Sequence, residues 1–494
     1  MNQLTLSLDD YEGPLYLRLA RALQQAIRTG CVAPGEPLPT SRLLAEQLGI
    51  NRHTVMRAYA ELCAQGWIES QQRSGYRVMH ALPIEQSTAP KHRPQQSAQF
   101  KWQLARTLPS ENSFIKTYPH LTYNFAGGRP DLALFPFDEY RSCLNDALRR
   151  PDPSQLNYGN NRGEASLLEQ AQRYLRRSRA LVDRDIMIVN GSQEAIYILA
   201  QLLLGPGDYV AVEALGYPPA WQALRASGAQ LEPIAQDEYG ICPHALEVAA
   251  QHCQLKCLYL TPLHQYPSTV TLSRQRRRAI YQLAQQYQFF IIEDDYDHEF
   301  HYKCQPLAPM AADDPAQLVI YLSSFSKVMY PAARCGLLAA PKVLVDALVQ
   351  LRACINHKPP QLLQEALARW MRGGGLERHI RRCTKKYQQR RENALKQVVA
   401  AQQRGLKLHC RPPDGGMALW INCAVDTTIL ADMAFKKGVF VQHGAEFSLR
   451  RDTSATQYIR LGFAGLEREA FNAGFGLLME CLALLQCDTK NTDD

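Results

Sequence analysis

A lysine stands among serines in the stretch SSFSKVMYPAARCG, which runs from Ser323 to Gly336. No acidic residue lies within this stretch, and Arg334 follows Lys327 by seven residues. Hydroxyl groups and a guanidinium suit an anion, because arginine can bind a phosphate through two parallel hydrogen bonds. A solvated surface loop would usually scatter charges of both signs. The stretch therefore predicts an anion site with a lysine beside it.

An acidic motif, EDDYDHEF, follows the apolar run FFII and begins at Glu293. Asp294 and Tyr296 are two residues apart, so in an extended segment both side chains face the same side. A carboxylate and a phenol directed at one point suit a ring with a basic nitrogen and a phenolic oxygen. The alternative is an exposed acidic turn, but the apolar run before it favours burial.

Further motifs follow other strand-like runs. Ser192 opens a helix after Gly191, and free N–H groups at a helix start can hold an anion, although a plain helix cap is the alternative. Tyr217 could stack on a planar ring or be an ordinary core or surface tyrosine. His264 also follows a strand-like run, where a lone histidine is usually structural. A lysine near a carboxylate, a phenol and a phosphate site predicts pyridoxal phosphate (PLP) bound to Lys327 as a Schiff base.

The residues above follow short apolar runs, which we expect to be the strands that position them. DIMIVN, YVAVEA, KCLYLT, FFIIEDD and QLVIYLS are typical of strands, and amphipathic stretches such as SRQRRRAIYQLAQQY separate them. This alternation predicts an α/β fold with a mostly parallel sheet covered by helices on both faces. Ligands of such sheets lie beyond the carboxyl ends of the strands, which is where all of the motifs above occur.

The first 80 residues have a different pattern. Three segments, PLYLRLARALQQAIRTG, PTSRLLAEQLG and INRHTVMRAYAELCAQG, predict helices that end at Gly30, Gly49 and Gly66, and Asn51 is a good N-cap for the third. WIESQQRSGYRVM alternates apolar and polar residues around Ser74-Gly75, which predicts a two-stranded wing. The buried stripes would be Leu15, Leu19, Ala22, Leu23, Ala26 and Ile27 in the first helix and Val55, Ala58, Tyr59 and Leu62 in the third.

This order of helices and wing is that of a winged helix-turn-helix, which places its third helix in the major groove of DNA. Polar residues that could contact double-stranded DNA lie on the second and third helices and near the wing tip. They are Arg42, Arg52, His53, Thr54, Arg57 and Arg73. A small helical module with solvated arginines is the alternative.

The composition separates these modules. Residues 82–100, LPIEQSTAPKHRPQQSAQF, are rich in Pro, Gln and Ser and cannot bury enough surface to fold alone. We therefore expect a DNA-binding domain over residues 1–80, a linker over 81–118 and a larger domain over 119–480. Within the larger domain, a small C-terminal α+β subdomain is expected over roughly residues 355–480.

The whole chain has 494 residues, 46% of them hydrophobic, and a net charge of +8, which alone is too weak to argue for nucleic acid. No apolar run reaches the roughly 20 residues that span a bilayer, and the N-terminus does not have the pattern of a signal peptide. The 14 cysteines include no Cys-x-x-Cys pair, so reduced thiols and no metal site are expected. These features predict a cytoplasmic protein without a membrane partner.

Two resemblances make these predictions more specific. PLPTSRLLAEQLGINRHTVMRAYAELCAQGWIESQQRSGYRV resembles the winged helix of GntR-type bacterial repressors, and NFAGGRPDLALFP, NGSQEAI, HQYPS, IIEDDYDHEF, SSFSKVMYPAARCG and YIRLGFA resemble motifs of fold-type I aminotransferases. Together they resemble the MocR/GabR branch of GntR-type regulators. The resemblance implies that Arg42, Arg52, Thr54, Arg57 and Gly75 lie at DNA.

The resemblance also implies roles in the larger domain. Lys327 would form the Schiff base, Asp294 would pair with the pyridine nitrogen, Tyr296 would contact the phenolic oxygen and Tyr217 would stack on the ring. Arg460 matches an arginine that binds an amino acid's carboxylate. The residues at the phosphate would be Ser192, Gln193, Ser324, Ser326 and Arg334.

Some positions depart from the resembled pattern. His264 stands where aminotransferases usually carry asparagine beside the cofactor, as in other members of this branch of regulators. The remaining departures, which change loop geometry, are Thr269, Ser323, Ala332 and Ala333.

The expected protein is a homodimeric, PLP-dependent transcriptional regulator whose effector is an amine, an amino acid or PLP. One alternative is a working aminotransferase with a DNA-binding head. Another is a repressor whose larger domain has lost PLP, against which the intact Lys327, Asp294 and Arg334 argue.

Overall fold

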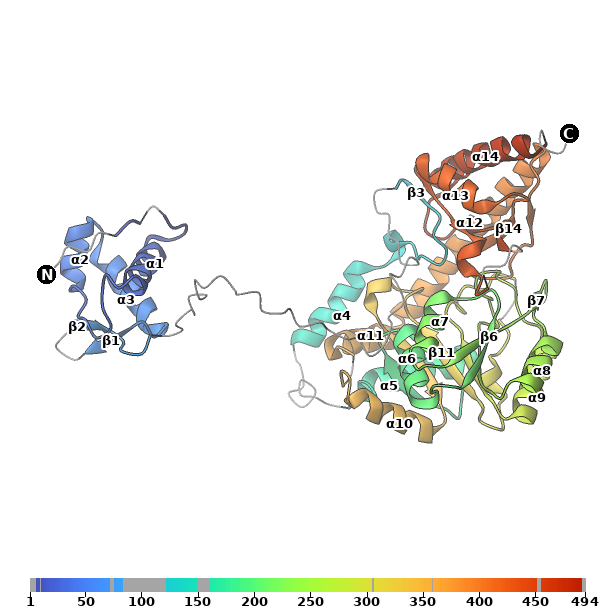
Figure 1. The fold of residues 1–494 in the computed structure, drawn as a ribbon, viewed down its shortest axis with the longest axis horizontal. Coiled ribbons are helices and arrows are strands. Elements are labelled where there is room, and N and C mark those ends of the chain that lie inside the picture. Colours follow the sequence, from blue (N-terminus) through green and yellow to red (C-terminus); the bar gives the residue numbers. More distant parts are fainter. Residues whose placement is uncertain are drawn as a thin grey trace, which may run out of the picture. The chain divides into compact units, whose positions relative to one another are not determined.

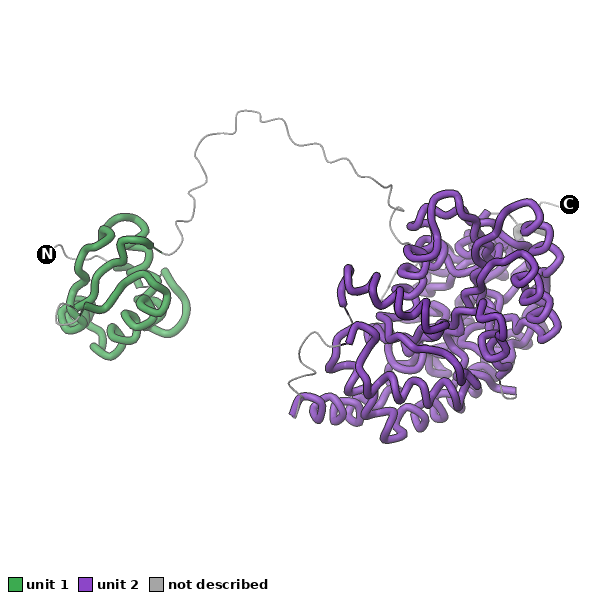
Figure 2. Tube along the Cα trace, turned by 90° about the horizontal axis from the view of Figure 1, so that it is seen from below, with its two compact units in different colours: residues 1–107 green, residues 108–494 purple. Residues whose placement is uncertain are grey.

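The structure, a computed structural model, describes residues 6–8, 10–71, 75–82, 121–149, 160–303, 306–357, 359–450 and 455–490. The chain divides into two compact units, residues 1–107 and 108–494 (Figure 2). Residues 83–118 of the predicted linker and Arg73 lie outside the described residues.

The first unit contains the predicted helices and wing (Figure 1). Thr40 caps α2 and Asn51 caps α3 by accepting backbone N–H groups, and Gly49 ends α2 with a φ of 63°. The two strands pair antiparallel, with Ile68 opposite Val78. The elements are α1 (Leu15–Arg28), α2 (Ser41–Leu48), α3 (Arg52–Ala64), β1 (Ile68–Gln71) and β2 (Gly75–Val78).

The predicted stripes lie in the core of the first unit with one exception. The stripe of α1 from Leu19 to Ile27 is buried, as are Val55, Ala58, Tyr59 and Leu62 of α3. Leu15 was predicted to be buried but is 39% exposed, because it opens α1 and lies before the buried stripe begins at Leu19.

A seven-stranded sheet forms the centre of the second unit, in the order β4-β12-β11-β10-β9-β5-β6 (Figure 1). All strands run parallel except β12, which is antiparallel to both of its neighbours. The strands are β4 (Asp185–Val189), β5 (Tyr209–Glu213), β6 (Gln230–Ile234), β9 (Leu255–Leu260), β10 (Phe290–Asp294), β11 (Val319–Ser324) and β12 (Gly336–Ala340). The mostly parallel α/β sheet is therefore confirmed, but β6 and β12 were not predicted.

Both faces of this sheet are covered, as expected for a parallel sheet. Successive residues of one strand enter different hydrophobic clusters: Ile186 and Ile188 pack on one face, and Met187 and Val189 on the other. The first face is covered by α5 (Ala165–Arg179), α9 (Arg274–Tyr287) and α11 (Gln361–Arg372). The second is covered by α6 (Ser192–Leu203), α7 (Pro218–Arg225) and α10 (Lys342–Ala353).

A smaller layer follows the long helix α12 (Gly375–Gln403). It has a four-stranded antiparallel sheet in the order β13-β14-β17-β16. The strands are β13 (His409–Cys410), β14 (Ala418–Asn422), β16 (Gln442–His443) and β17 (Tyr458–Gly462). A separate pair joins β15 (Val439–Phe440) to β3 (Tyr123–Asn124), so a segment from the start of the second unit belongs to this layer.

Two helices, α13 (Thr427–Lys436) and α14 (Arg468–Lys490), complete the smaller layer (Figure 1). By length and composition, the part of α14 from Arg468 to Cys487 could cross a membrane. Its residues Phe471, Phe475 and Leu482 are nevertheless buried in the main core cluster. One apolar side packed on neighbouring elements is typical of a core helix.

The remaining elements lie between those described above. They are η2 (Leu132–Leu134), α4 (Phe137–Arg149), β7 (Gln236–Asp237), β8 (Gly240–Ile241), α8 (Pro243–His252), η3 (Met310–Ala312), η4 (Pro331–Ala333) and η5 (Gly444–Phe447).

Candidate functional site

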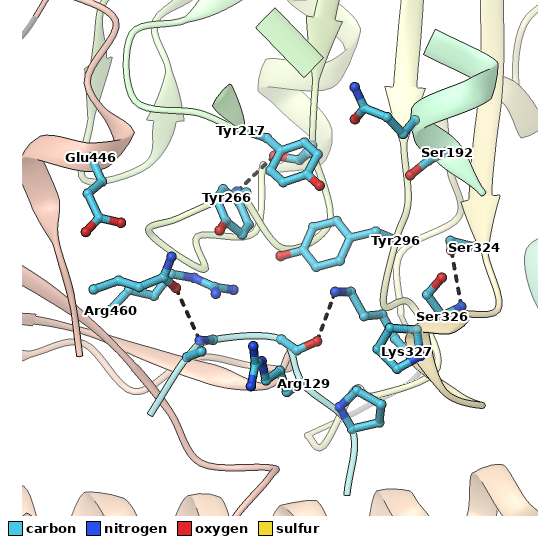
Figure 3. A pocket seen from close by; sticks show the side chains of 18 of the residues that line it. Arg129, Ser192, Tyr217, Tyr266, Tyr296, Ser324, Ser326, Lys327, Glu446 and Arg460 are labelled. Atoms are coloured by element: carbon cyan, nitrogen blue, oxygen red, sulfur yellow. Dashed lines mark hydrogen bonds between the residues drawn. The ribbon is translucent and has the colours of Figure 1, made fainter. Parts of the chain in front are cut away.

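The carboxyl ends of the parallel strands open into a cavity of about 970 Å³. Because β12 runs the opposite way, its first residues lie at this same edge, and Arg334 just precedes them. The smaller layer closes the other side through α13, β16 and β17. The predicted residues that line the cavity are Ser192, Gln193, Tyr217, Asp294, Tyr296, Ser324, Ser326, Lys327, Arg334 and Arg460. Those labelled in Figure 3 are Ser192, Tyr217, Tyr296, Ser324, Ser326, Lys327 and Arg460.

Lys327 points into the cavity, where its Nζ donates a hydrogen bond to the carbonyl oxygen of Gly128 at 2.9 Å (Figure 3). Burial lowers the pKa of this amine to about 8, and the positive charge of Arg460 acts in the same direction. Both effects disfavour the ammonium form. The amine is thus prepared to react as a nucleophile near neutral pH.

Asp294 is 3% exposed at the end of β10. Its Oδ2 accepts a hydrogen bond from the hydroxyl of Tyr259 at 2.9 Å, while its buried Oδ1 has no partner among the described residues. Burial raises the pKa of this carboxyl to about 7, although the Tyr259 hydrogen bond lowers it. A buried carboxylate oxygen without a donor is costly, and a ring N–H would satisfy it.

Tyr296 also lines the cavity, and its hydroxyl donates to the carbonyl oxygen of His264 at 3.0 Å. Asp295 faces the other side, where it accepts from Tyr321 at 2.8 Å and pairs with Arg179 at 2.6 Å. The prediction that Asp294 and Tyr296 face one side is therefore confirmed by the geometry.

The whole acidic run is buried, so the alternative of an exposed acidic turn is wrong. Glu293 is 1% exposed and accepts the backbone N–H groups of Met310 and Ala311 at 2.9 and 3.0 Å. Asp297 is 2% exposed beside His264. Each acid has a partner of its own, which offsets the cost of burying it.

The start of α6 and the turn after β11 form a polar end of the cavity. Gly191 has a φ of 83°, and a Cβ there would come within 3.2 Å of the Arg334 guanidinium. Ser324 Oγ accepts from the backbone N–H of Ser326 at 3.2 Å. Free N–H groups at the start of α6, two serines and an arginine together make a site suited to a phosphate.

Arg460 lies at the other end, 1% exposed on β17. Its guanidinium carbon is 4.3 Å from the centroid of the Tyr266 ring, and its Nε and Nη1 have no hydrogen-bond partner among the described residues. A buried guanidinium with unused donors suits a carboxylate.

His264 is the one predicted cofactor contact that does not line the cavity. Its Nδ1 lies 2.7 Å from Asp297 Oδ1, and its Nε2 lies 3.2 Å from Nδ1 of His301. The two imidazole rings stack with an interplanar angle of 12°. This position favours the structural alternative for the His264 ring.

Several lining residues were not predicted. Gly128 and Arg129 follow β3, Tyr259 lies within β9, Tyr266 lies in a loop, and Glu446 lies in η5. For Gly128 and Arg129, the paired glycines of NFAGGRPD could have indicated a place in the site, because such a pair lets the backbone approach a neighbouring group closely. The tyrosines and Glu446 had no sequence signal of their own.

In the first unit, Arg42, Arg52, His53 and Arg57 are exposed and Thr54 is half-buried. Arg52 Nε donates to Ser41 Oγ at 3.3 Å, and the Arg57 guanidinium lies 4.0 Å from the Tyr16 ring centroid. Gly75 opens β2 with a φ of 87°, a conformation that favours glycine. Exposed arginines on the second and third helices are available to phosphates and base edges.

Within the described ranges, no group of three or more His, Cys, Asp or Glu side chains is placed to hold a metal ion.

Known proteins resemble both units. Residues 15–78 match the family described as bacterial regulatory proteins, gntR family. The chain is 30% identical over 482 residues to the HTH-type transcriptional regulator TauR of Rhodobacter capsulatus, covering 95% of this chain and 97% of that protein. It is 29% identical to the probable rhizopine catabolism regulatory protein MocR of Rhizobium meliloti, covering 97% and 95%.

The second unit resembles a solved enzyme. The Pyrococcus horikoshii kynurenine aminotransferase, crystallised in complex with PMP, matches with a TM-score of 0.67 and 29% identity, covering 73% of this chain and 90% of that chain. The large domain around the cavity therefore has the fold of PLP-dependent aminotransferases.

Proposed function

Because the chain belongs to the GntR family of bacterial transcriptional regulators, in the MocR-type branch with an aminotransferase-like domain, we propose that it senses an amine, an amino acid or PLP through PLP held at Lys327. The DNA-binding unit would be the output, and the cavity of the second unit the sensor. Such a regulator acts on the chromosome and hence in the cytoplasm.

The residues of the cavity fit PLP. Asp294 Oδ1 is buried and has no donor among the residues that the structure describes, as expected of a partner for the ring nitrogen. Gly191 leaves room at the polar end, where a side chain would approach Arg334. The amine of Lys327 lies in the same cavity. The single observation that carries the proposal is that one cavity contains both a buried carboxylate oxygen with no partner within the described ranges and a lysine whose pKa is lowered to about 8.

Bound PLP supplies an aldehyde that reacts reversibly with primary amines. Lys327 would be the amine that holds it and that an effector's amine replaces. Asp294 would keep a proton on the ring nitrogen, and Ser192, Ser326 and Arg334 would hold the phosphate. Arg460 would bind a carboxylate on the effector.

A response at DNA requires a change between states of the protein. An effector can shift that balance only by binding one state better than the other. We propose that the protein is a homodimer, so that two winged helices bind paired half-sites. By contacting both walls of the cavity, the effector would favour one of the two states of the dimer over the other.

The second candidate is a working aminotransferase with a DNA-binding head. The lowered pKa of Lys327 favours it, because an amine that titrates near pH 8 can both accept and donate a proton. The winged helix favours regulation, since an aminotransferase has no evident use for it.

The test uses the purified full chain. We expect a visible absorption band after PLP addition, and borohydride followed by mass spectrometry should find the pyridoxyl group on Lys327. K327A should lose both. Lys342→Ala is the matched control, since Lys342 is an exposed lysine paired with Asp346. A wild-type protein that stays colourless in PLP would overturn the proposal.

A further inference from the structure

The wall of the cavity opposite its serines carries charges of both signs. Arg460 stands there, and Glu446 lines the same cavity from η5 (Figure 3). The Glu446 side chain is 26% exposed and its Oε1 lies 3.3 Å from Nε2 of His443. A second acid, Asp432 of α13, also lines the cavity. None of the roles proposed above for binding the phosphate and ring of PLP involves Glu446 or Asp432.

Backbone contacts hold η5 against the cavity. The carbonyl oxygen of Phe447 accepts from Gly216 N at 3.0 Å, and Leu449 N donates to the carbonyl oxygen of Ala214 at 3.0 Å. The buried Phe447 ring packs edge-on against Tyr266 with centroids 5.5 Å apart. The backbone that carries Glu446 is therefore held at the wall of the cavity.

Tyr266 lies beside both charged residues: the Arg460 guanidinium carbon is 4.3 Å from its ring centroid, and Phe447, the neighbour of Glu446 in the chain, packs against the same ring. Burial is the main cause that raises the pKa of its phenol. Arg460 lowers this pKa and Glu446 raises it, so both charges act on the same group. A ligand beside Tyr266 would thus meet a cation and an anion together.

We propose that the effector is a diamino acid, whose carboxylate pairs with Arg460 while its second cationic group pairs with Glu446. This inference rests on the proposed function, since the first amino group is the one presented at Lys327. Glu446 would repel a dicarboxylic amino acid, and a neutral amino acid would form no ion pair with Glu446. Asp432 adds negative charge to the cavity wall.

The PLP-loaded full chain would be titrated with matched pairs: L-ornithine against L-norvaline, and L-lysine against L-norleucine, with L-glutamate as the acidic probe. Each pair differs by one terminal amine. The change in the visible spectrum gives the affinity, and gel shift gives the effect on DNA binding. We expect the better-fitting diamino acid to bind about 10–100-fold more tightly than its neutral partner, as a charge-assisted hydrogen bond allows.

Glu446→Gln should remove this preference while leaving the affinity for norvaline and norleucine within about threefold, a change of less than 1 kcal/mol. Glu480→Gln is the matched control, because Glu480 is an exposed carboxylate on α14, paired with Lys437 at 3.0 Å and outside the cavity lining. The Glu480→Gln variant should prefer the diamino acids over their neutral partners to the same degree as the wild type. Melting curves and the PLP band of each variant report whether it is folded and loaded.

Equal affinities for ornithine and norvaline and for lysine and norleucine, or a preference that survives in the folded Glu446→Gln variant, would overturn the inference. So would a response to glutamate alone. In these cases the PLP band would still be present, and the proposed function would stand. Loss of the band in the wild type would instead contradict the proposed function itself.

Discussion

Tyr259 donates its hydroxyl hydrogen to Oδ2 of Asp294 across 2.9 Å, and both side chains are buried. The two residues lie on adjacent parallel strands, β9 and β10. This hydrogen bond favours the charged carboxylate, whereas burial favours the neutral acid. The balance between them sets how well Asp294 can hold a protonated ring nitrogen.

Tyr259→Phe should therefore weaken PLP binding. Without the hydroxyl, the pKa of Asp294 rises above about 7, so more of the acid is neutral at pH 7. We expect PLP affinity to fall by about tenfold, which is one pKa unit, and the loss to shrink at pH 9. Absorbance titration at both pH values measures it. Tyr281→Phe is the control, because Tyr281 donates to the buried Asp314 at 2.7 Å and neither residue lines the cavity.

Asp294→Asn should stabilise the protein without PLP at neutral and alkaline pH. Folding raises the pKa of Asp294 from 3.8 to about 7, so the folded state binds more protons between these values. The contribution of Asp294 to stability is thus full below pH 3.8 and is lost as the pH rises toward 7. We expect the variant to be about 2–4 kcal/mol more stable at pH 8, with the difference shrinking toward pH 4.

Urea unfolding of PLP-free protein between pH 4 and pH 8 tests this. Asp346→Asn, which changes an exposed carboxylate, should not alter the pH profile. If the free energy of unfolding of the wild type changed with pH in parallel with that of Asp294→Asn, Asp294 would be ionised over this pH range and the prediction would be wrong.

His264→Asn should cost stability more than it costs PLP binding. The His264 ring lies outside the cavity lining and contacts Asp297, which is buried. Removing a partner from a buried carboxylate costs about 1–3 kcal/mol. Thermal unfolding and PLP titration of the same samples separate the two effects. A large loss of PLP affinity with unchanged stability would instead support the cofactor contact that the resemblance implied.

Arg52→Ala and Arg57→Ala should each weaken binding to an operator duplex by about 1–3 kcal/mol if these arginines contact base edges, and by less if they contact phosphates alone. Fluorescence anisotropy measures the affinity, and the PLP band should not change. Arg225→Ala, an exposed arginine of α7, is the control. Because Arg57 also lies over Tyr16, its variant needs a melting curve. DNA binding that survives deletion of residues 1–80 would contradict the assignment.

Turnover distinguishes the sensor from the enzyme. We expect amino acids that change the visible spectrum to alter DNA binding, and transamination to be absent or much slower than the enzyme median of about 10 per second. Product analysis after incubation with amino acids and keto acids measures it. Rapid multiple turnover without an effect on DNA binding would favour the aminotransferase.

The sequence by itself determined many of the elements and the residues of the cavity that suit PLP. Periodicity predicted α1 to α3, the wing and five strands. The burial of one helical face, or of a short apolar run, depends on the types of residues that are close together in the sequence. In a parallel sheet the residues after each strand meet at one edge, so Asp294, Lys327 and Ser192 could be assigned to one site before any contact was known.

The tertiary structure alone decided which side chains complete that site. β12 was missed because a short run such as GLLAA has no periodicity, and β6 because it contains Pro233, which only an edge strand tolerates. Tyr259 meets Asp294 only through strand pairing, and Glu446 reaches Arg460's end of the cavity only because η5 bonds to the loop after β5. The direction of the His264 ring was likewise set by Asp297 and His301. Such contacts join residues far apart in the chain, and local pattern carries no information about them.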